Sequence, residues 1–114
     1  MAKTVPMKGA LSANSHRYEA EDGTAIYDSG DEYKSASAAS RGLDNLIKSA
    51  TRVVKQGTKK DGKGRITGRR VELSFSHGRG AKPEIVIAWT DGPWVERLSS
   101  TSLPLLLDFE SQYP

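Results

Sequence analysis

Residues 35–57 read SASAASRGLDNLIKSATRVVKQG, and their apolar side chains recur with the period of an α-helix. The apolar stripe consists of Ala39, Leu43, Leu46, Ile47, Ala50 and Val54. Spacings of three and four residues place these side chains on one face of a helix. The pattern predicts an amphipathic helix over residues 36–55. Ser35 or Ser37 would cap its start, and Gly57 would end it in a left-handed conformation.

A hairpin is expected before this helix, in the stretch HRYEAEDGTAIYDS at residues 16–29. Asp22-Gly23 is typical of a two-residue type I′ turn, whose central positions both need a positive φ. This turn would place Tyr18 opposite Tyr27. The two tyrosines would then share one face of the hairpin, and Ile26 would lie on the other.

Further strands are expected after the helix. Residues 71–77 alternate between apolar and polar, which predicts a half-buried strand, and residues 84–90 are apolar on both faces, as in a central strand. Because Pro93 has no N–H group, we expect a loop of about four residues after this strand rather than a tight turn. The tail after Ser102 is either a short helix capped by that serine or an extended edge segment.

The predicted order is therefore two strands, a helix, three strands and a short last element. This order is typical of an α+β fold, with an antiparallel β-sheet and one long amphipathic helix packed on it. A chain of 114 residues fits one domain, which we place at residues 16–112. Residues 1–15 lack any periodicity, and we expect them to form a disordered arm.

Composition limits the kinds of site that the chain can form. It has no cysteine, which excludes disulfides and thiolate metal sites. No apolar run approaches the ~20 residues needed to cross a bilayer. The first residues also lack the apolar core of a secretory signal. We therefore expect a soluble, cytoplasmic protein with no membrane partner.

Positive charge is concentrated between the predicted helix and the strand at residues 71–77. The whole chain has a net charge of +3, yet residues 51–70 contain eight bases and one acid, a net +7. We predict a flexible loop over residues 56–69 that presents this charge to an anion. The candidate nucleic-acid-binding residues are Lys55, Lys59, Lys60, Lys63, Arg65, Arg69 and Arg70.

The same run contains the spacing of a phosphate-binding P-loop, G-x-x-x-x-G-K, at residues 57–63. Gly64 stands where the magnesium-binding Ser or Thr is needed. The run also leads into a strand, whereas a P-loop opens a helix whose N-terminus faces the phosphates. No nucleotide cofactor is therefore expected.

For the other residues that could take part in binding or catalysis, structural roles are favoured. Trp89 and Trp94 could stack on unpaired bases if they are exposed, but aromatic residues in the strands of a small domain usually pack in its core. His16 and His77 have no nucleophile at a recognisable spacing. The remaining cluster is a run of acids expected in a solvated turn: Asp28, Asp31 and Glu32. We predict no catalytic residue and no metal ligand.

Residues 17–50 combine several features of one known family. They are Ala20 and Asp22-Gly23 at the turn, Ser29 at a strand end, Tyr33 in a loop, and Ser35, Ala38, Gly42 and Leu43 on the helix. In this spacing they resemble the repeating unit of the YegP-like small domains of unknown function. Asp22, Ala36 and Ser37 replace the family's usual Asn, Lys and Ala. The resemblance implies that Gly42 lets the helix lie close to the hairpin, and that this unit pairs with a second copy. It implies no activity.

Two functions fit these features. In the first, the protein is a non-enzymatic module whose basic loop contacts DNA or RNA. In the second, it is a protein-interaction or self-assembly module, such as a phage or plasmid accessory protein. A sheet edge, or the face that bears Val86 and Val95, would then meet a target protein or form a homodimer, and the basic loop would be only a solvated connection. No cofactor and no small-molecule substrate is expected in either case.

Overall fold

The computed structural model describes residues 9–112 and has the α+β fold that the sequence predicts. Its strands are β1 (Ser12–Glu19), β2 (Ala25–Glu32), β3 (Arg52–Lys60), β4 (Ile66–Phe75), β5 (Glu84–Asp91) and β6 (Trp94–Ser100). Its helices are α1 (Ala36–Ser49) and α2 (Leu103–Ser111). The described residues thus contain one strand that was not predicted, β3, and their last element is helical.

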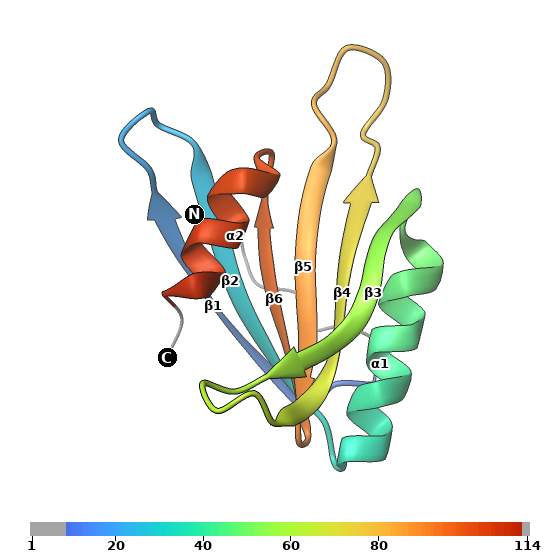
Figure 1. Cartoon of the computed structure of the whole chain (residues 1–114). Helices are drawn as coiled ribbons and strands as arrows, with labels where there is room; N and C mark the ends of the chain where they lie inside the picture. The colour runs from blue at the N-terminus through green and yellow to red at the C-terminus, as the bar shows by residue number, and fades with distance from the viewer. Residues whose placement is uncertain (1–8, 113–114) are drawn as a thin grey trace.

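The strands form one antiparallel sheet in the order β1-β2-β6-β5-β4-β3. Strands β3 to β6 follow one another as a meander, and β6 then pairs with β2. The chain passes through α1 between β2 and β3, which leaves β1 and β3 as the two edges of the sheet (Figure 1). Strand β5 lies between β4 and β6, so the prediction that residues 84–90 form a central strand is confirmed.

The start of α1 agrees with the prediction. Ser35 caps the helix by accepting a hydrogen bond from the backbone N–H of Ala38 at 3.0 Å. A Cβ atom on Gly42 would collide with the hydroxyl of Tyr33, a side chain that is only 3% exposed. Glycine at this position therefore lets the helix lie close to the loop that follows β2. Burial raises the pKa of Tyr33 above its ordinary value.

The predicted end of the helix near residue 55, with Gly57 as its cap, is wrong. The helix stops at Ser49, and Gly57 lies within β3. The backbone N–H of Thr51 already donates to a carbonyl of β4 at 2.9 Å. Two valines follow in β3, and their branched side chains favour a strand over a helix. The apolar stripe alone did not show this change of structure.

The predicted flexible loop over residues 56–69 is wrong for most of its length. Strand β3 continues to Lys60 and β4 begins at Ile66, so only residues 61–65 connect them. Two register shifts interrupt this pairing. Glycine and lysine are depleted in strands, so the β-propensity of residues 52–60 does not indicate that they form a strand. Pairing with β4 decides the structure of this segment.

The first hairpin has a longer turn than predicted. Gly23 has a φ of +87°, whereas Asp22 does not have a positive φ, which excludes a type I′ turn. The register is shifted by one residue as a result, and Tyr18 lies opposite Ile26 instead of Tyr27. Such a shift exchanges the two faces of a strand. Tyr18 and Ile26 therefore share a face, contrary to the prediction.

Strand β1 also begins earlier than expected. Residues 12–15 belong to it, so the prediction of a disordered arm is wrong for them. The rest of the predicted arm falls largely on residues 1–8, which lie outside the described residues.

The reversal between β5 and β6 is tighter than predicted. Asp91 pairs with Trp94, which leaves a turn of two residues. Gly92 takes the first position with a φ of +57°, and Pro93 takes the second. In a two-residue turn the closing N–H group belongs to the residue after the turn, so the absent N–H of Pro93 is not needed.

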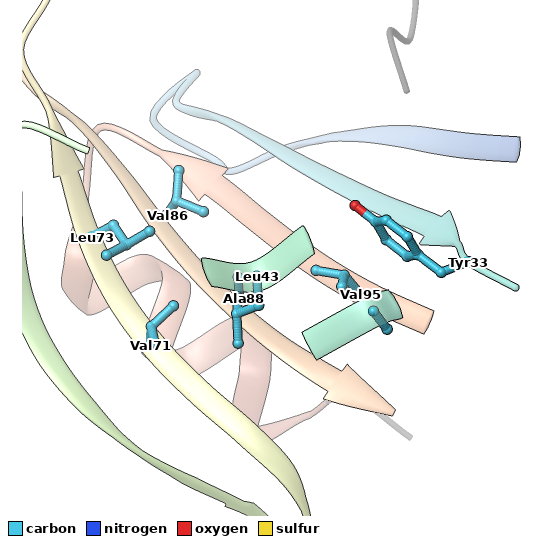
Figure 2. Packing of buried hydrophobic residues seen from close by; sticks show 8 residues of the cluster. Tyr33, Leu43, Val71, Leu73, Val86, Ala88 and Val95 are labelled. Atoms are coloured by element: carbon cyan, nitrogen blue, oxygen red, sulfur yellow. The ribbon is translucent and has the colours of Figure 1, made fainter. Parts of the chain in front are cut away.

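One face of the sheet is covered by α1. The buried cluster there consists of Tyr33, Ala39, Leu43, Val71, Leu73, Val86, Ala88 and Val95. Figure 2 shows Leu43 of the helix above the strand side chains. Val86 and Val95 are among the buried residues, so this face is not available to another subunit, contrary to one part of the second predicted function.

The opposite face is covered by α2, which begins as one of the two alternatives predicts. Ser102 accepts a hydrogen bond from the backbone N–H of Leu105 at 3.3 Å. The buried cluster beneath the helix consists of Ile26, Ile87, Trp89, Leu98 and Leu106. Tyr18 of β1 packs beside the same helix, with 5.1 Å between the ring centres of Tyr18 and Phe109.

Candidate nucleic-acid interface

The seven basic residues predicted to bind nucleic acid all lie on the β3–β4 hairpin, but they divide into two groups. Three of them form ion pairs that tie the hairpin to the helices: Lys59, Arg69 and Arg70. The other four are exposed: Lys55, Lys60, Lys63 and Arg65. The structure therefore separates cations that hold the fold from cations that face solvent.

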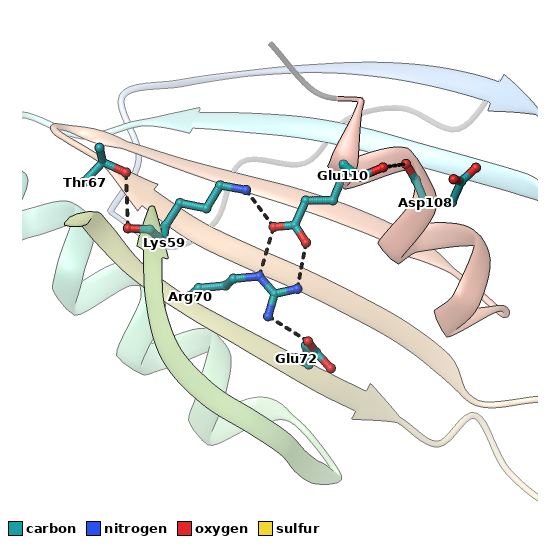
Figure 3. A network of polar contacts seen from close by, with 7 residues as sticks. Lys59, Thr67, Arg70, Glu72, Asp108 and Glu110 are labelled. Carbon is teal, nitrogen blue, oxygen red and sulfur yellow. Dashed lines mark hydrogen bonds and ion pairs between the residues drawn. The ribbon is translucent and has the colours of Figure 1, made fainter. Parts of the chain in front are cut away.

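Arg70 belongs to the first group. Its Nε and Nη2 atoms donate to the two carboxylate oxygens of Glu110 at 2.9 and 2.7 Å, and Nη1 donates to Glu72 at 2.7 Å (Figure 3). These bonds raise the pKa of Arg70 although its burial opposes this. The side chain is 15% exposed. Arg70 is thus a partly buried cation that is held by two carboxylates of the protein.

Lys59 is held by the same carboxylate. Its Nζ donates to Glu110 at 2.7 Å and lies 4.2 Å from the ring centre of Trp89. This distance permits a cation–π interaction. Burial by itself would raise the pKa of Glu110, but the bonds from Arg70 and Lys59 lower it below its ordinary value. Glu110 therefore stays ionised and joins α2 to both strands of the hairpin.

Arg69 points to the opposite face and contacts α1. Its Nη2 lies 2.7 Å from Asp44, and its Nη1 donates to the hydroxyl and the carbonyl of Ser40 at 2.8 and 3.2 Å. The hairpin is thus tied to a helix on each face of the sheet. A flexible tether, as the sequence suggested, would have no such contacts.

The turn between β3 and β4 is also ordered by internal bonds. The carboxylate of Asp61 accepts from the backbone N–H groups of Lys63 and Arg65 at 2.8 and 3.0 Å, and from Nε of Arg65 at 2.8 Å. The backbone bond from Arg65 is the largest cause that lowers the pKa of Asp61. Gly64 has a φ of +79°, a conformation that favours glycine.

The exposed cations lie along the edge strand β3 and in the turn that follows it. Arg52 begins β3 and is exposed too, although it was not among the predicted site residues. We define the β3 edge surface as Arg52, Lys55, Lys60, Lys63 and Arg65. Asp61 is the one acid in the segment that carries them. Arg52 could have been found from the charge count, but only strand pairing places it on the same edge.

A groove of about 590 Å³ lies between the hairpin and α2. Its walls carry two lysines but four carboxylates, which come from Asp61, Asp91, Glu96 and Glu110. Such a lining disfavours an anion. The outer edge, and not this groove, is the part of the hairpin that suits a polyanion.

The predicted stacking residues are not available as a pair. Trp89 is 4% exposed, beneath Lys59 and within the core on the α2 face. The prediction that Trp89 stacks on bases is therefore wrong. The alternative prediction, that it packs in the core, is confirmed. Trp94 begins β6 and is partly buried. Within residues 9–112, neither tryptophan therefore offers an open stacking surface beside the exposed cations of the hairpin.

The acids expected in a solvated turn lie in β2 instead. Asp31 is fully buried and accepts from Nε of Arg97 at 3.0 Å. Asp28 is also buried, and Glu32 accepts from the hydroxyl of Ser12 at 3.2 Å. Strand β2 extends to Glu32 because residues 28–32 pair with β1 on one side and with β6 on the other.

The two histidines lie apart from each other. His16 is exposed in the edge strand β1. His77 lies beyond the end of β4, with its Nε2 3.6 Å from Glu84. Within residues 9–112, no group of three His, Asp or Glu side chains could hold a metal ion.

In the same described residues, neither helix has the length and apolar character required to span a bilayer. The resemblance of residues 17–50 to YegP-like domains stays a prediction. Comparison of the chain with protein-family models, with curated protein sequences and with solved structures gave no match.

Proposed function

We propose that this protein is a non-enzymatic module that binds a nucleic-acid backbone through the β3 edge surface. The observation that carries the proposal is the row of five exposed cations on one outer strand and its turn, with a single acid among them. Each such cation can neutralise a phosphate and release condensed counterions. The cytoplasmic location that the sequence predicts would give the module access to nucleic acid.

The order of the hairpin supports this proposal. Ion pairs to α1 and α2 hold the outer part of the hairpin, and Asp61 fixes its turn. Binding then requires little further ordering of the backbone, which is the cost that weakens binding by flexible segments. Lys55, Lys60 and Lys63 form no ion pair within the described residues, so a phosphate would not have to displace an internal acid.

Lysines on an edge strand have a second explanation. They prevent edge-to-edge pairing of sheets, as charged side chains and register shifts commonly do. That role needs cations on the strand itself, whereas Lys63 and Arg65 lie in or beside the turn, outside β3. The charge therefore extends further than protection of the edge requires.

The test is a titration of labelled DNA and RNA oligonucleotides at about 50 and 200 mM salt. The test variant replaces Lys55, Lys60 and Lys63 by Ala, and the matched control replaces Lys34, Lys48 and Lys82, which are exposed outside the hairpin. We expect the test variant to lower the slope of log K against log salt by about 2.7 on duplex DNA, since each phosphate contact contributes about 0.9. Absence of binding at low salt, or an equal loss in both variants, would refute the proposal.

Self-assembly through an edge is a second candidate, favoured by one observation. Strand β1 is an open edge of eight residues, and its pairing with β2 runs without a register shift, unlike that of β3. An unprotected edge can pair with a second strand. Sedimentation at high protein concentration decides between the two, because a strict monomer leaves this candidate without support.

A further inference from the structure

Ile66, which is apolar and open to solvent, lies next to the β3 edge surface. Its side chain is 67% exposed, although it begins a strand. It follows Arg65 in the chain and pairs across the hairpin with Lys60. An isolated exposed apolar residue needs no explanation by itself. This one is surrounded by the cations that we assign to nucleic-acid binding.

The end of the hairpin is a two-stranded ribbon. Strand β4 pairs with β5 only from Arg70 onward, whereas its pairing with β3 continues to Ile66. In the outer part of the hairpin, residues 58–69, the backbone ladder has two strands, and the N–H of Arg69 donates to the hydroxyl of Thr90 in β5 at 2.9 Å. In Figure 1 this part crosses in front of the lower end of the sheet and ends in the turn at the lower left. Cations and Ile66 are together at the tip of a narrow ribbon.

The side chains of this ribbon suit a duplex better than a single strand. Binding of single strands relies on aromatic side chains that stack on unpaired bases. Trp89, the aromatic residue next to the ribbon, is buried beneath Lys59. Phosphate contacts need no base stacking, and the paired strands of a duplex present phosphates on both sides of a groove.

We infer that the partner is duplex DNA, and that the tip of the β3–β4 ribbon enters its minor groove with Ile66 as an apolar wedge between base pairs. This inference rests on the proposed function. Lys60, Lys63 and Arg65 contact the phosphates on either side of the groove, and Ile66 partly unstacks one base step. Apolar wedges of this kind bend the duplex by about 20–90° toward the major groove.

The ordered turn supports a wedge. An apolar side chain can unstack bases only if its backbone does not yield, and three bonds to the carboxylate of Asp61 hold the turn that precedes Ile66. The register shift between Lys59 and Lys60 lies next to it. Irregularities of this kind redirect side chains at the ends of strands. The ribbon thus has both the charge and the rigid apolar tip that groove insertion requires.

The experiment measures bending and binding of the full chain together. A duplex of about 30 base pairs carries a fluorescent donor and an acceptor at its two ends, so that bending raises energy transfer. The test variant is Ile66→Ser. The matched control is Leu11→Ser, which changes an equally exposed residue, 68%, that precedes β1. Thermal unfolding of both variants by circular dichroism verifies that they remain folded.

We expect the wild-type protein and Leu11→Ser to raise energy transfer, and Ile66→Ser to abolish most of the rise. Because Ile66→Ser removes no charge, the slope of log K against log salt should stay unchanged, and the affinity should fall about tenfold for the loss of one unstacking contact. Salt-dependent binding without bending, or with bending that Ile66→Ser leaves intact, would overturn the inference and leave the proposed function standing.

Three other outcomes are also decisive. Tighter binding of single-stranded DNA than of the duplex would overturn the choice of partner. Preference for duplex RNA would do the same, since the minor groove of RNA is wide and shallow and offers no narrow site for a wedge. Failure to bind any nucleic acid at low salt would overturn the proposed function and this inference together.

Discussion

The two faces of the sheet are covered by helices in different ways. On the α1 face, a helix of 14 residues contributes two fully buried side chains, Ala39 and Leu43, to a cluster of apolar residues. On the α2 face, a helix of nine residues contributes one buried side chain, Leu106. On this face, Glu110 adds to the contact between helix and sheet by accepting hydrogen bonds from Lys59 and Arg70.

This difference shows how one basic segment serves two purposes. Apolar packing is the main contact of α1, and the ion pair between Arg69 and Asp44 adds to it. The ion pairs of α2, in contrast, take Lys59 and Arg70 away from any external anion. A partly buried network of this kind gains less than its Coulomb energy suggests, because each charge first loses hydration. The two faces should therefore respond differently to mutation and to pH.

The largest effects are expected from loss of a buried leucine on either face. Leu43→Ala should lower the free energy of unfolding by about 3–5 kcal/mol, since it leaves a cavity in the larger cluster. Leu106→Ala should cost about 2–3 kcal/mol, because a short terminal helix can shift to fill part of the space. Urea denaturation of both variants measures the difference. Equal losses would show that the two faces are not packed differently.

A smaller loss is expected from Glu110→Ala, which removes the shared acceptor of Lys59 and Arg70. We expect a decrease of about 2–3 kcal/mol in the free energy of unfolding, since hydrogen bonds between charged groups contribute about 1.5–3 kcal/mol. Asp108→Ala is the control, because this acid is exposed two residues earlier in the same helix. It should change stability by less than about 0.5 kcal/mol. A similar effect in both variants would contradict the importance of the network.

The smallest effect is a dependence on pH that arises from Glu110 on the α2 face. The pKa of Glu110 is lower in the folded protein than its ordinary value of 4.5. Its contribution to stability is therefore complete above pH 4.5 and is lost as the pH falls through the lowered folded pKa. The stability difference between the wild-type protein and Glu110→Gln should shrink from about pH 5 to pH 3. A constant difference over this range would refute the lowered pKa of Glu110.

Part of the fold could be predicted because its signals are local. The period of the apolar stripe around Leu43 predicts α1, Ser35 marks its start, and the apolar run of residues 84–90 predicts a central strand. The register of the first hairpin could not be predicted, because Asp22-Gly23 is compatible with turns of different lengths. An error of one residue there placed Tyr18 and Tyr27 on the same face, although Tyr18 lies opposite Ile26 and the two tyrosines are on opposite faces.

The candidate site was predicted only in outline. The sequence shows that positive charge gathers in residues 51–70, and the structure keeps this charge together on one hairpin. The sequence did not show that this segment forms paired strands, since its glycines and lysines resemble those of a loop. Nor did it show that Trp89 is buried beneath Lys59, which depends on contacts between separate strands.

The sequence by itself determined the α+β class, the helix, the central strand and the location of the charge, because period, capping and charge depend on residues close together in the chain. Only the tertiary structure decided which cations are free. Glu110 lies 40 residues from Arg70 and 51 from Lys59, and nothing local relates these positions. Folding brings the carboxylate to two of the seven predicted cations. Lys55, Lys60 and Lys63 remain without such an acid, at the edge of the sheet.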